Sequence, residues 1–254
     1  MKIFRKARIQ FLEKGKPGKY LKYAIGEILL VVIGILIALQ INNMNEDAKE
    51  NRILNEYLVK IKSHTEEDLR ELETAIAARK QFASVCKQAR KAMLTKTEDQ
   101  NMMVMLTSGL AFVDFYFKPK DDGYEALKSS NSFGKINNSR LDSLLIQYHI
   151  TIDLIAENEK SYNEYILTQE AHISKHFDRT LVLAAAFMNQ DSLAKLEIPQ
   201  SEFTKDYKAY TSIPAYRNVV GLAAFQFDSM VKQYQKLAKT GEEVINEIEK
   251  LTGK

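Results

Sequence analysis

Residues 23–41 read YAIGEILLVVIGILIALQI, and Glu27 and Gln40 are their only strongly polar members. An α-helix rises about 1.5 Å per residue, so this stretch would be about 28 Å long as a helix. The hydrocarbon layer of a bilayer is about 30 Å thick. The stretch therefore predicts a membrane-spanning helix, and the rest of the chain is organised around it.

The flanks of this stretch carry unequal charge. Residues 1–22 contain eight Lys or Arg and one Glu, a net charge of +7, which leaves −4 for residues 23–254 in a chain whose net charge is +3. Because Lys and Arg are enriched on the cytoplasmic side of spans, we expect the N-terminus in the cytoplasm and the remainder outside. The apolar run exceeds a usual signal-peptide core and no small-x-small site follows it, which favours an uncleaved anchor.

The chain thus divides into a basic cytoplasmic head at residues 1–22, a transmembrane helix at 23–41 and an extracytoplasmic domain at 42–254. Within the head, Ile3 and Phe11 would share one helical stripe among basic residues. That pattern is typical of an amphipathic helix on an anionic membrane surface. A plain cluster of topology-determining charge is an equally good interpretation, because so short a segment is marginal for a stable helix.

Three residues of the span are not generic. Glu27 lies one turn inside it, where a carboxylate either contacts another membrane helix or reaches back to the interface. Gly34 and Ala38 form a small-xxx-small pair, which lets another helix backbone approach closely. Glu27, Gly34 and Ala38 are therefore the candidate contacts to a membrane protein partner or to a second copy of the chain.

The same region carries a family resemblance. Residues 19–28, KYLKYAIGEI, and 31–43, VVIGILIALQINN, resemble the N-terminal signature of a family of bacterial single-span proteins of unknown function, found widely in the Bacteroidetes. Residues 124–130, YEALKSS, are similar to an internal motif of that family, whereas Met44 stands where the family often has Trp. The resemblance implies an inner-membrane protein with an outward, periplasmic helical domain, and it implies no known activity.

The remainder of the chain reads as helices. Residues 42–94 contain no Gly or Pro, and apolar side chains recur there at three- and four-residue steps. The same periodicity predicts a second long helix from Ser139 to about Met188 and a third that starts at Pro214. Three helices with one apolar stripe each must bury those stripes against one another. The expected fold is all-α: a transmembrane helix that continues into an elongated helical bundle of three long helices plus short helices.

Shorter signals mark expected breaks and connections. Ser63 and Glu66 fit a capping box that would interrupt the first long helix, and Asp122 and Glu125 fit another before a short helix over residues 124–130. Residues 189–213 are polar and contain a proline, which predicts an irregular connection. The aromatic residues of 112–117 either cover the core or form a ligand-stacking patch.

Motifs for chemistry are scarce. His172 and His176 have the only metal-like spacing, one helical turn apart, but zinc needs a third and usually a fourth ligand. No HExxH, GxSxG, Walker, GxGxxG or CxxC motif is present. The single cysteine, Cys86, excludes an intrachain disulfide and is either a small core residue or a bridge to a second chain. We therefore expect no metal, no cofactor and no enzymatic activity.

Three classes of function remain. A membrane-anchored, non-catalytic interaction or scaffold protein fits best, because the chain has an anchor and a bundle but no catalytic motif. A bundle that senses a small ligand and signals through a membrane partner is the alternative, and a metal-dependent enzyme is the third. A mildly acidic domain gives no electrostatic case for nucleic acid, so the expected partners are the lipid bilayer and a membrane protein or a second copy.

Overall fold

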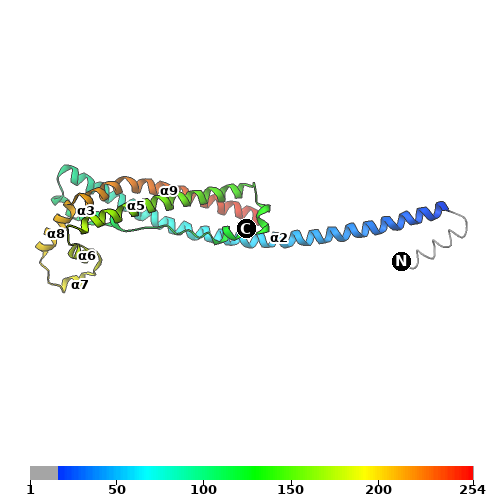
Figure 1. Ribbon diagram of the computed structural model, residues 1–254, viewed down its shortest axis with the longest axis horizontal. Helices are drawn as coiled ribbons and strands as arrows, with labels where there is room; N and C mark the ends of the chain where they lie inside the picture. Colours follow the sequence, from blue (N-terminus) through cyan, green and yellow to red (C-terminus); the bar gives the residue numbers. More distant parts are fainter. Residues whose placement is uncertain (1–16, 254) are drawn as a thin grey trace. The chain divides into compact units, whose positions relative to one another are not determined.

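The computed structural model describes residues 17–253, and every regular element in them is helical (Figure 1). This confirms the all-α prediction, while the head segment at 1–14 lies outside the described residues. In chain order the helices are α2 Pro17–Thr95, η1 Asp99–Asn101, α3 Met102–Ser108, η2 Gly109–Phe112, α4 Asp122–Lys128, η3 Asn131–Lys135, α5 Arg140–Ser174, α6 Thr180–Phe187, α7 Gln190–Ala194, α8 Gln200–Ser212 and α9 Pro214–Thr252.

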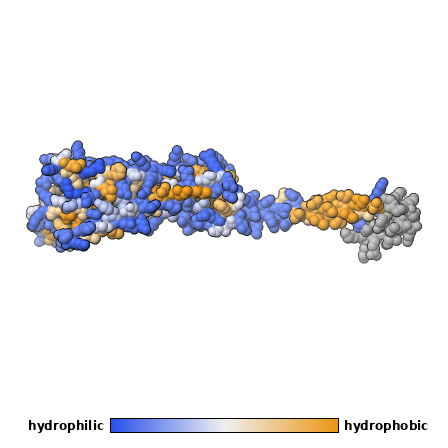
Figure 2. Space-filling view, turned by 45° about the horizontal axis from the view of Figure 1, so that its top comes forward, coloured by the Kyte–Doolittle hydropathy of each residue, from blue (hydrophilic) through white to orange (hydrophobic). Residues whose placement is uncertain are grey.

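The chain forms two compact units, Met1–Glu56 and Tyr57–Lys254. In the first, the described residues belong to α2, and each of residues 28–41 is exposed. Figure 2 shows this apolar stretch from one side. Among the residues described, this is the one helix long and apolar enough to cross a membrane. Length and composition alone support that statement.

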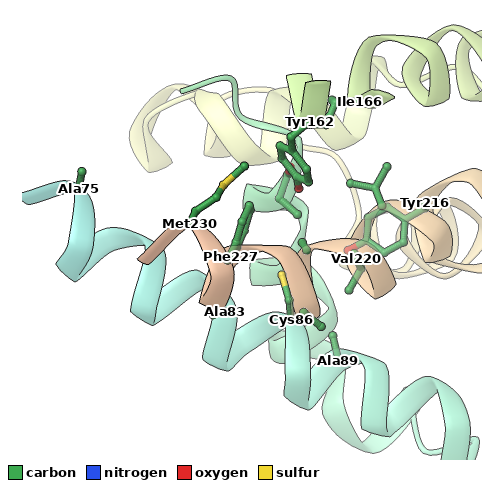
Figure 3. Close-up of a cluster of buried hydrophobic side chains, with 14 of the residues drawn as sticks. Ala75, Ala83, Cys86, Ala89, Tyr162, Ile166, Tyr216, Val220, Phe227 and Met230 are labelled. Atoms are coloured by element: carbon green, nitrogen blue, oxygen red, sulfur yellow. The ribbon is translucent and has the colours of Figure 1, made fainter. Parts of the chain in front are cut away.

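The second unit is held together by the three predicted long helices. α5 and α9 lie side by side, and α2 from Tyr57 onward completes the bundle (Figure 1). Between residues 75 and 89 the buried apolar residues of α2 are small: Ala75, Ala83, Cys86 and Ala89 (Figure 3). Large side chains of α5 and α9 fill the space that these leave, among them Tyr162, Tyr216 and Phe227. Small residues facing large rings let the helices pack closely without voids.

Cys86 belongs to this core. Its side chain is buried beside Ala83 and Ala89, and burial raises the pKa of the thiol to about 12. A thiol buried in this way behaves as a small apolar residue. The bridge to a second chain would require the sulfur to leave the core, so the core reading of Cys86 is the one that the structure supports.

Several helix boundaries differ from the expected ones. The capping box at residues 63–66 does not interrupt α2: Thr65 is buried and its hydroxyl donates to the Ile61 carbonyl one turn earlier. The buried face formed by Leu58, Ile61 and Leu72 runs through that position, and packing overrides the local capping signal. The second capping box is also wrong, because α4 begins at Asp122 itself without a side-chain cap.

The second long helix is shorter than expected. α5 ends at Ser174 rather than near Met188. At this end the amides of His176 and Phe177 both donate to the Ile173 carbonyl. Asp178 then accepts from the Thr180 amide at the start of α6, so the chain turns back on itself. Residues 189–213 are likewise not an irregular connection, since they contain α7 and α8.

Two helix starts were predicted correctly. The Ser139 hydroxyl accepts from the Asp142 amide at 3.2 Å and caps α5, and Asp142 in turn accepts from the Asn138 amide. Pro214 occupies the first turn of α9, where its missing N–H has no cost. At the other end α9 stops at Gly253, whose φ of 69° suits a residue without a side chain.

Candidate functional site

A polar cluster, made of Arg79, Glu159 and Tyr234, lies inside the bundle. It takes one residue from each long helix, and Arg79 and Glu159 are only 3% and 1% exposed. The Tyr234 hydroxyl donates to Glu159 Oε1 at 2.5 Å, and the Phe117 amide donates to Glu159 Oε2 at 2.9 Å. One buried carboxylate thus joins α5 to α9 and to the connector that follows η2.

Arg79 and Glu159 carry opposite charges within an apolar setting, and Arg79 Nη2 has no hydrogen-bond partner among the described residues. Burial raises the pKa of Glu159, while its two hydrogen bonds and the Arg79 charge act in the opposite direction. The Arg79 guanidinium lies 4.4 Å from the ring centre of Phe227 and 5.0 Å from that of Phe115, where a cation is attracted by the ring faces. The polar cluster fixes the bundle and presents no group to solvent.

The aromatic connector at residues 112–117 covers the core beside this cluster. Phe117 is buried, the side-chain amide of Asn163 donates through Nδ2 to the Phe115 carbonyl, and the Tyr162 hydroxyl donates to the Ala111 carbonyl. Phe112 stacks on Tyr216 with ring centres 5.6 Å apart. Three of its aromatic residues, Phe112, Phe115 and Phe117, therefore pack against the core, whereas Tyr116 is 49% exposed. Phe112 also lines the pocket described below.

Asp68 forms a second buried polar site nearer the start of the bundle. Its Oδ1 accepts from the Lys120 amide and its Oδ2 from the Tyr148 hydroxyl, each at 3.0 Å. The Lys120 ammonium also pairs with Glu67 one residue earlier. Burial is the main cause that raises the pKa of Asp68 from 3.8 to about 6, against the lowering effect of both hydrogen bonds. Asp68 thus anchors Lys120, which lies between the aromatic connector and α4, to α2.

Asp68 should make the stability of the bundle depend on pH. A carboxyl group whose folded pKa exceeds its unfolded pKa binds its proton more tightly when folded, so its contribution is present below about pH 4 and lost as the pH rises through 6. Two pKa units correspond to about 3 kcal/mol. We expect the stability of the protein relative to Asp68→Asn to fall by about 2–3 kcal/mol between pH 4 and 7. Urea unfolding followed by tyrosine fluorescence measures this, and a pH-independent difference would contradict it.

An apolar pocket of about 360 Å³ lies where α3, η2, α6 and α8 meet the end of α5. Its walls are mainly aliphatic and aromatic, with a polar corner formed by Glu170, Arg179 and Tyr210; the other lining residues are Leu106, Thr107, Gly109, Leu110, Phe112, Val113, Val182, Leu183, Ala185, Ala186, Phe187 and Tyr207. Arg179 Nη2 donates to Glu170 Oε1 at 2.5 Å. Ligand pockets commonly combine apolar walls with a few polar groups in this way.

The two predicted histidines do not form a helical pair. His172 is in the last turn of α5, but His176 lies beyond the end of that helix, and both side chains are exposed. His176 therefore lies outside the regular helix on which the prediction placed both imidazoles. Within residues 17–253, no group of three or more His, Cys, Asp or Glu side chains could hold a metal ion.

The predicted contact residues of the span lie on one side of α2. At about 100° per residue, Glu27, Gly34 and Ala38 fall within a sector of about 40°. A Cβ added at Gly34 would meet nothing within 4 Å, so this side of the helix is open to another helix. Gly26 is equally open but points about 80° away from Gly34.

Sequence reasoning missed the buried charges. Arg79 occupies a position of the apolar stripe of α2 between Ala75 and Ala83, and Glu159 occupies the stripe of α5 between Ile155 and Tyr162. A charged residue at a stripe position was the available signal for both. The pocket had no such signal, because its walls come from five elements whose arrangement depends on the turn after α5.

Comparison with known proteins identifies the family of this chain but assigns it no activity. No curated protein and no solved structure matches the chain. The profile of a family of unknown function, DUF6090, matches residues 27–193, from within α2 to α7. The matched range contains Glu27, Gly34, Arg79 and Glu159 and leaves α8 and α9 outside. Since the match covers more than half of the chain, this protein belongs to the DUF6090 family of unknown function.

Proposed function

We propose that this protein is a single-pass, membrane-anchored interaction protein without catalytic activity. Residues 23–41 would cross a bacterial inner membrane, with the head at 1–22 in the cytoplasm and residues 42–254 in the periplasm. One observation carries the proposal: α2 has a surface suited to lipid near its start and supplies core residues of the folded unit further along.

The exposed surface of residues 28–41 supports the anchor. Eleven large apolar side chains there are at least 40% exposed: Ile28, Leu29, Leu30, Val31, Val32, Ile33, Ile35, Leu36, Ile37, Leu39 and Ile41. Exposed apolar area costs about 25 cal/mol per Å² in water, and patches of more than a few hundred Å² mark interaction or membrane surfaces. Lipid would cover all sides of the helix at once, whereas a soluble partner would have to surround it.

The use of buried acids supports an interaction protein over an enzyme. Glu159 accepts from Tyr234 and Phe117, and Asp68 accepts from Tyr148 and Lys120, so both carboxylates act as structural acceptors between helices and connector. A catalytic acid would instead face a cleft within reach of a substrate. In this unit the buried charges stabilise a defined surface, which is what a binding partner requires.

The face with Glu27, Gly34 and Ala38 is the proposed contact to a partner helix. Without a hydrophobic driving force between helices in lipid, association depends on close packing at small residues and on polar contacts. This face supplies both. A second copy of the chain and a different membrane protein are the two kinds of partner that the experiment separates.

A matched pair of glycine variants tests this face. Gly34→Leu should weaken cross-linking to the partner in intact membranes several-fold, because its side chain would hold the helices apart. Gly26→Leu makes the same change on another side of the helix and should leave the cross-links unchanged. Mass spectrometry of the cross-linked species identifies a second copy or a different protein. Equal cross-linking in both variants, and in a chain with a polyleucine span, would assign recognition to the folded unit instead.

A further inference from the structure

We propose that the apolar pocket between α6 and α8 binds a small, uncharged, mainly apolar molecule that carries one hydrogen-bond-accepting oxygen. The inference goes beyond anchoring and partner contact, and it rests only on residues of the second unit. The volume of about 360 Å³ is near the lower end of the 300–1,000 Å³ typical of ligand pockets, which indicates a small molecule rather than a peptide.

The composition of α6 is the first argument. The helix reads TLVLAAAF, and apart from Thr180 it is apolar on every side, yet Val182 is its only buried residue. A helix that is apolar all round is normally covered on all sides. Five of its eight residues line the pocket: Val182, Leu183, Ala185, Ala186 and Phe187. Of these, Phe187 is 73% exposed. An apolar ligand would cover the surface that α6 turns toward the pocket.

The polar corner is the second argument, and it defines the polar part of the ligand. Glu170 neutralises Arg179, so a ligand carboxylate would have to compete with Glu170 and would be repelled by it. A neutral oxygen has no such cost. Arg179 Nε is closed off from the pocket, whereas the Arg179 side chain as a whole is 15% exposed. A ligand oxygen would therefore be met by the Nη groups of Arg179 and by Tyr210 rather than by Nε.

Tyr210 strengthens this assignment. Its side chain lines the same pocket, and burial raises the pKa of its hydroxyl to about 12, although the Arg179 charge acts in the opposite direction. The hydroxyl therefore keeps its proton at neutral pH and can donate it in a hydrogen bond. The corner thus offers donors from Arg179 and Tyr210, while its formal charge is balanced, and this combination suits a ketone, ester or similar neutral acceptor.

Three probes of similar size separate the alternatives: acetophenone, ethylbenzene and benzoate. Each is titrated into the full chain in lipid nanodiscs, and fluorine NMR of fluorinated versions reports binding. We expect acetophenone to bind more tightly than ethylbenzene by about two- to tenfold, the value of one hydrogen bond, and benzoate to bind most weakly. If benzoate binds most tightly, or acetophenone and ethylbenzene bind equally, the proposed ligand class is wrong.

Two tryptophan variants show where the probe binds. Because both are measured in the same nanodiscs, partition of the probe into lipid contributes equally to each and does not affect the comparison. Ala186→Trp fills the pocket and should weaken acetophenone binding at least tenfold, whereas Ala209→Trp, on the exposed side of α8, should leave it within twofold. Equal effects of both would show that the probe binds elsewhere.

Arg179→Lys keeps a cation for Glu170 but removes the remaining guanidinium donors, so it should weaken acetophenone binding and leave ethylbenzene binding unchanged. If that variant does not fold, the three-probe comparison on the unaltered chain decides the question.

Discussion

A chain with Glu159→Leu should lose about 3–5 kcal/mol of its free energy of unfolding, because two buried donors lose their acceptor and Arg79 loses a nearby opposite charge. Glu159 is almost fully buried, and without it the Tyr234 hydroxyl and the Phe117 amide both lose their acceptor. Arg79 would remain inside the bundle beside the rings of Phe115 and Phe227, with its Nη2 already lacking a hydrogen-bond partner. Urea unfolding of the full chain in detergent, followed by tyrosine fluorescence, measures the loss; the sequence contains 12 Tyr and no Trp.

Two further variants show that the effect belongs to the polar cluster. Glu157→Leu makes the same change at an exposed position of α5 and should alter stability by no more than about 0.5 kcal/mol. The double variant Arg79→Met with Glu159→Leu removes both charges and should be about 2 kcal/mol more stable than the sum of the two single losses predicts. Strict additivity would contradict the view that Arg79 and Glu159 compensate each other.

Gly241→Leu should destabilise the bundle by about 2–3 kcal/mol through overpacking. Gly241 lies on α9 where the three long helices meet, and an added Cβ would be 3.1 Å from side-chain carbons of Leu69 and Tyr148 and 3.2 Å from Thr65. A leucine places three more carbons in the same space. The gain in helix propensity over glycine, about 0.8 kcal/mol, is smaller than this cost.

The matched control for this change is on the same helix. A Cβ at Gly221 would meet nothing within 4 Å, so Gly221→Leu should keep the propensity gain and leave stability equal or slightly higher. The two variants differ only in what surrounds the new side chain. Similar losses in both would show that α9 is sensitive to backbone change generally, and that the close approach at Gly241 is not its cause.

The fold could be predicted largely because its long helices have clear periodic patterns. Residues 42–94 lack helix breakers, and the caps at Ser139 and Pro214 fix two helix starts through local chemistry. The end of α5 could not be predicted in the same way. The turn after Ile173 contains no Gly or Pro, and it is held by Asp178 and by the ion pair between Arg179 and Glu170, which form only once α6 folds back.

The candidate sites differ in the same way: some are marked by the local sequence, and others depend on how the helices pack. Glu27, Gly34 and Ala38 were found because they are exceptions within an apolar run, and a contact through them remains a prediction. The polar cluster and the apolar pocket depend on which helices face each other, and a single sequence without contacts does not specify that. The sequence-based alternative of a ligand-sensing bundle now has a defined site to test, at the pocket lined by α6.

The central claim is that the chain is anchored by residues 23–41 with its folded unit outside the cytoplasm. The most direct test fuses alkaline phosphatase, which is active only outside the cytoplasm, or β-galactosidase, which is active only inside it, after Lys254 of the full chain. We expect an active phosphatase fusion and an inactive β-galactosidase fusion, with the protein retained in the membrane after an alkaline wash. The reverse activities, or release of the protein by the wash, would contradict this topology.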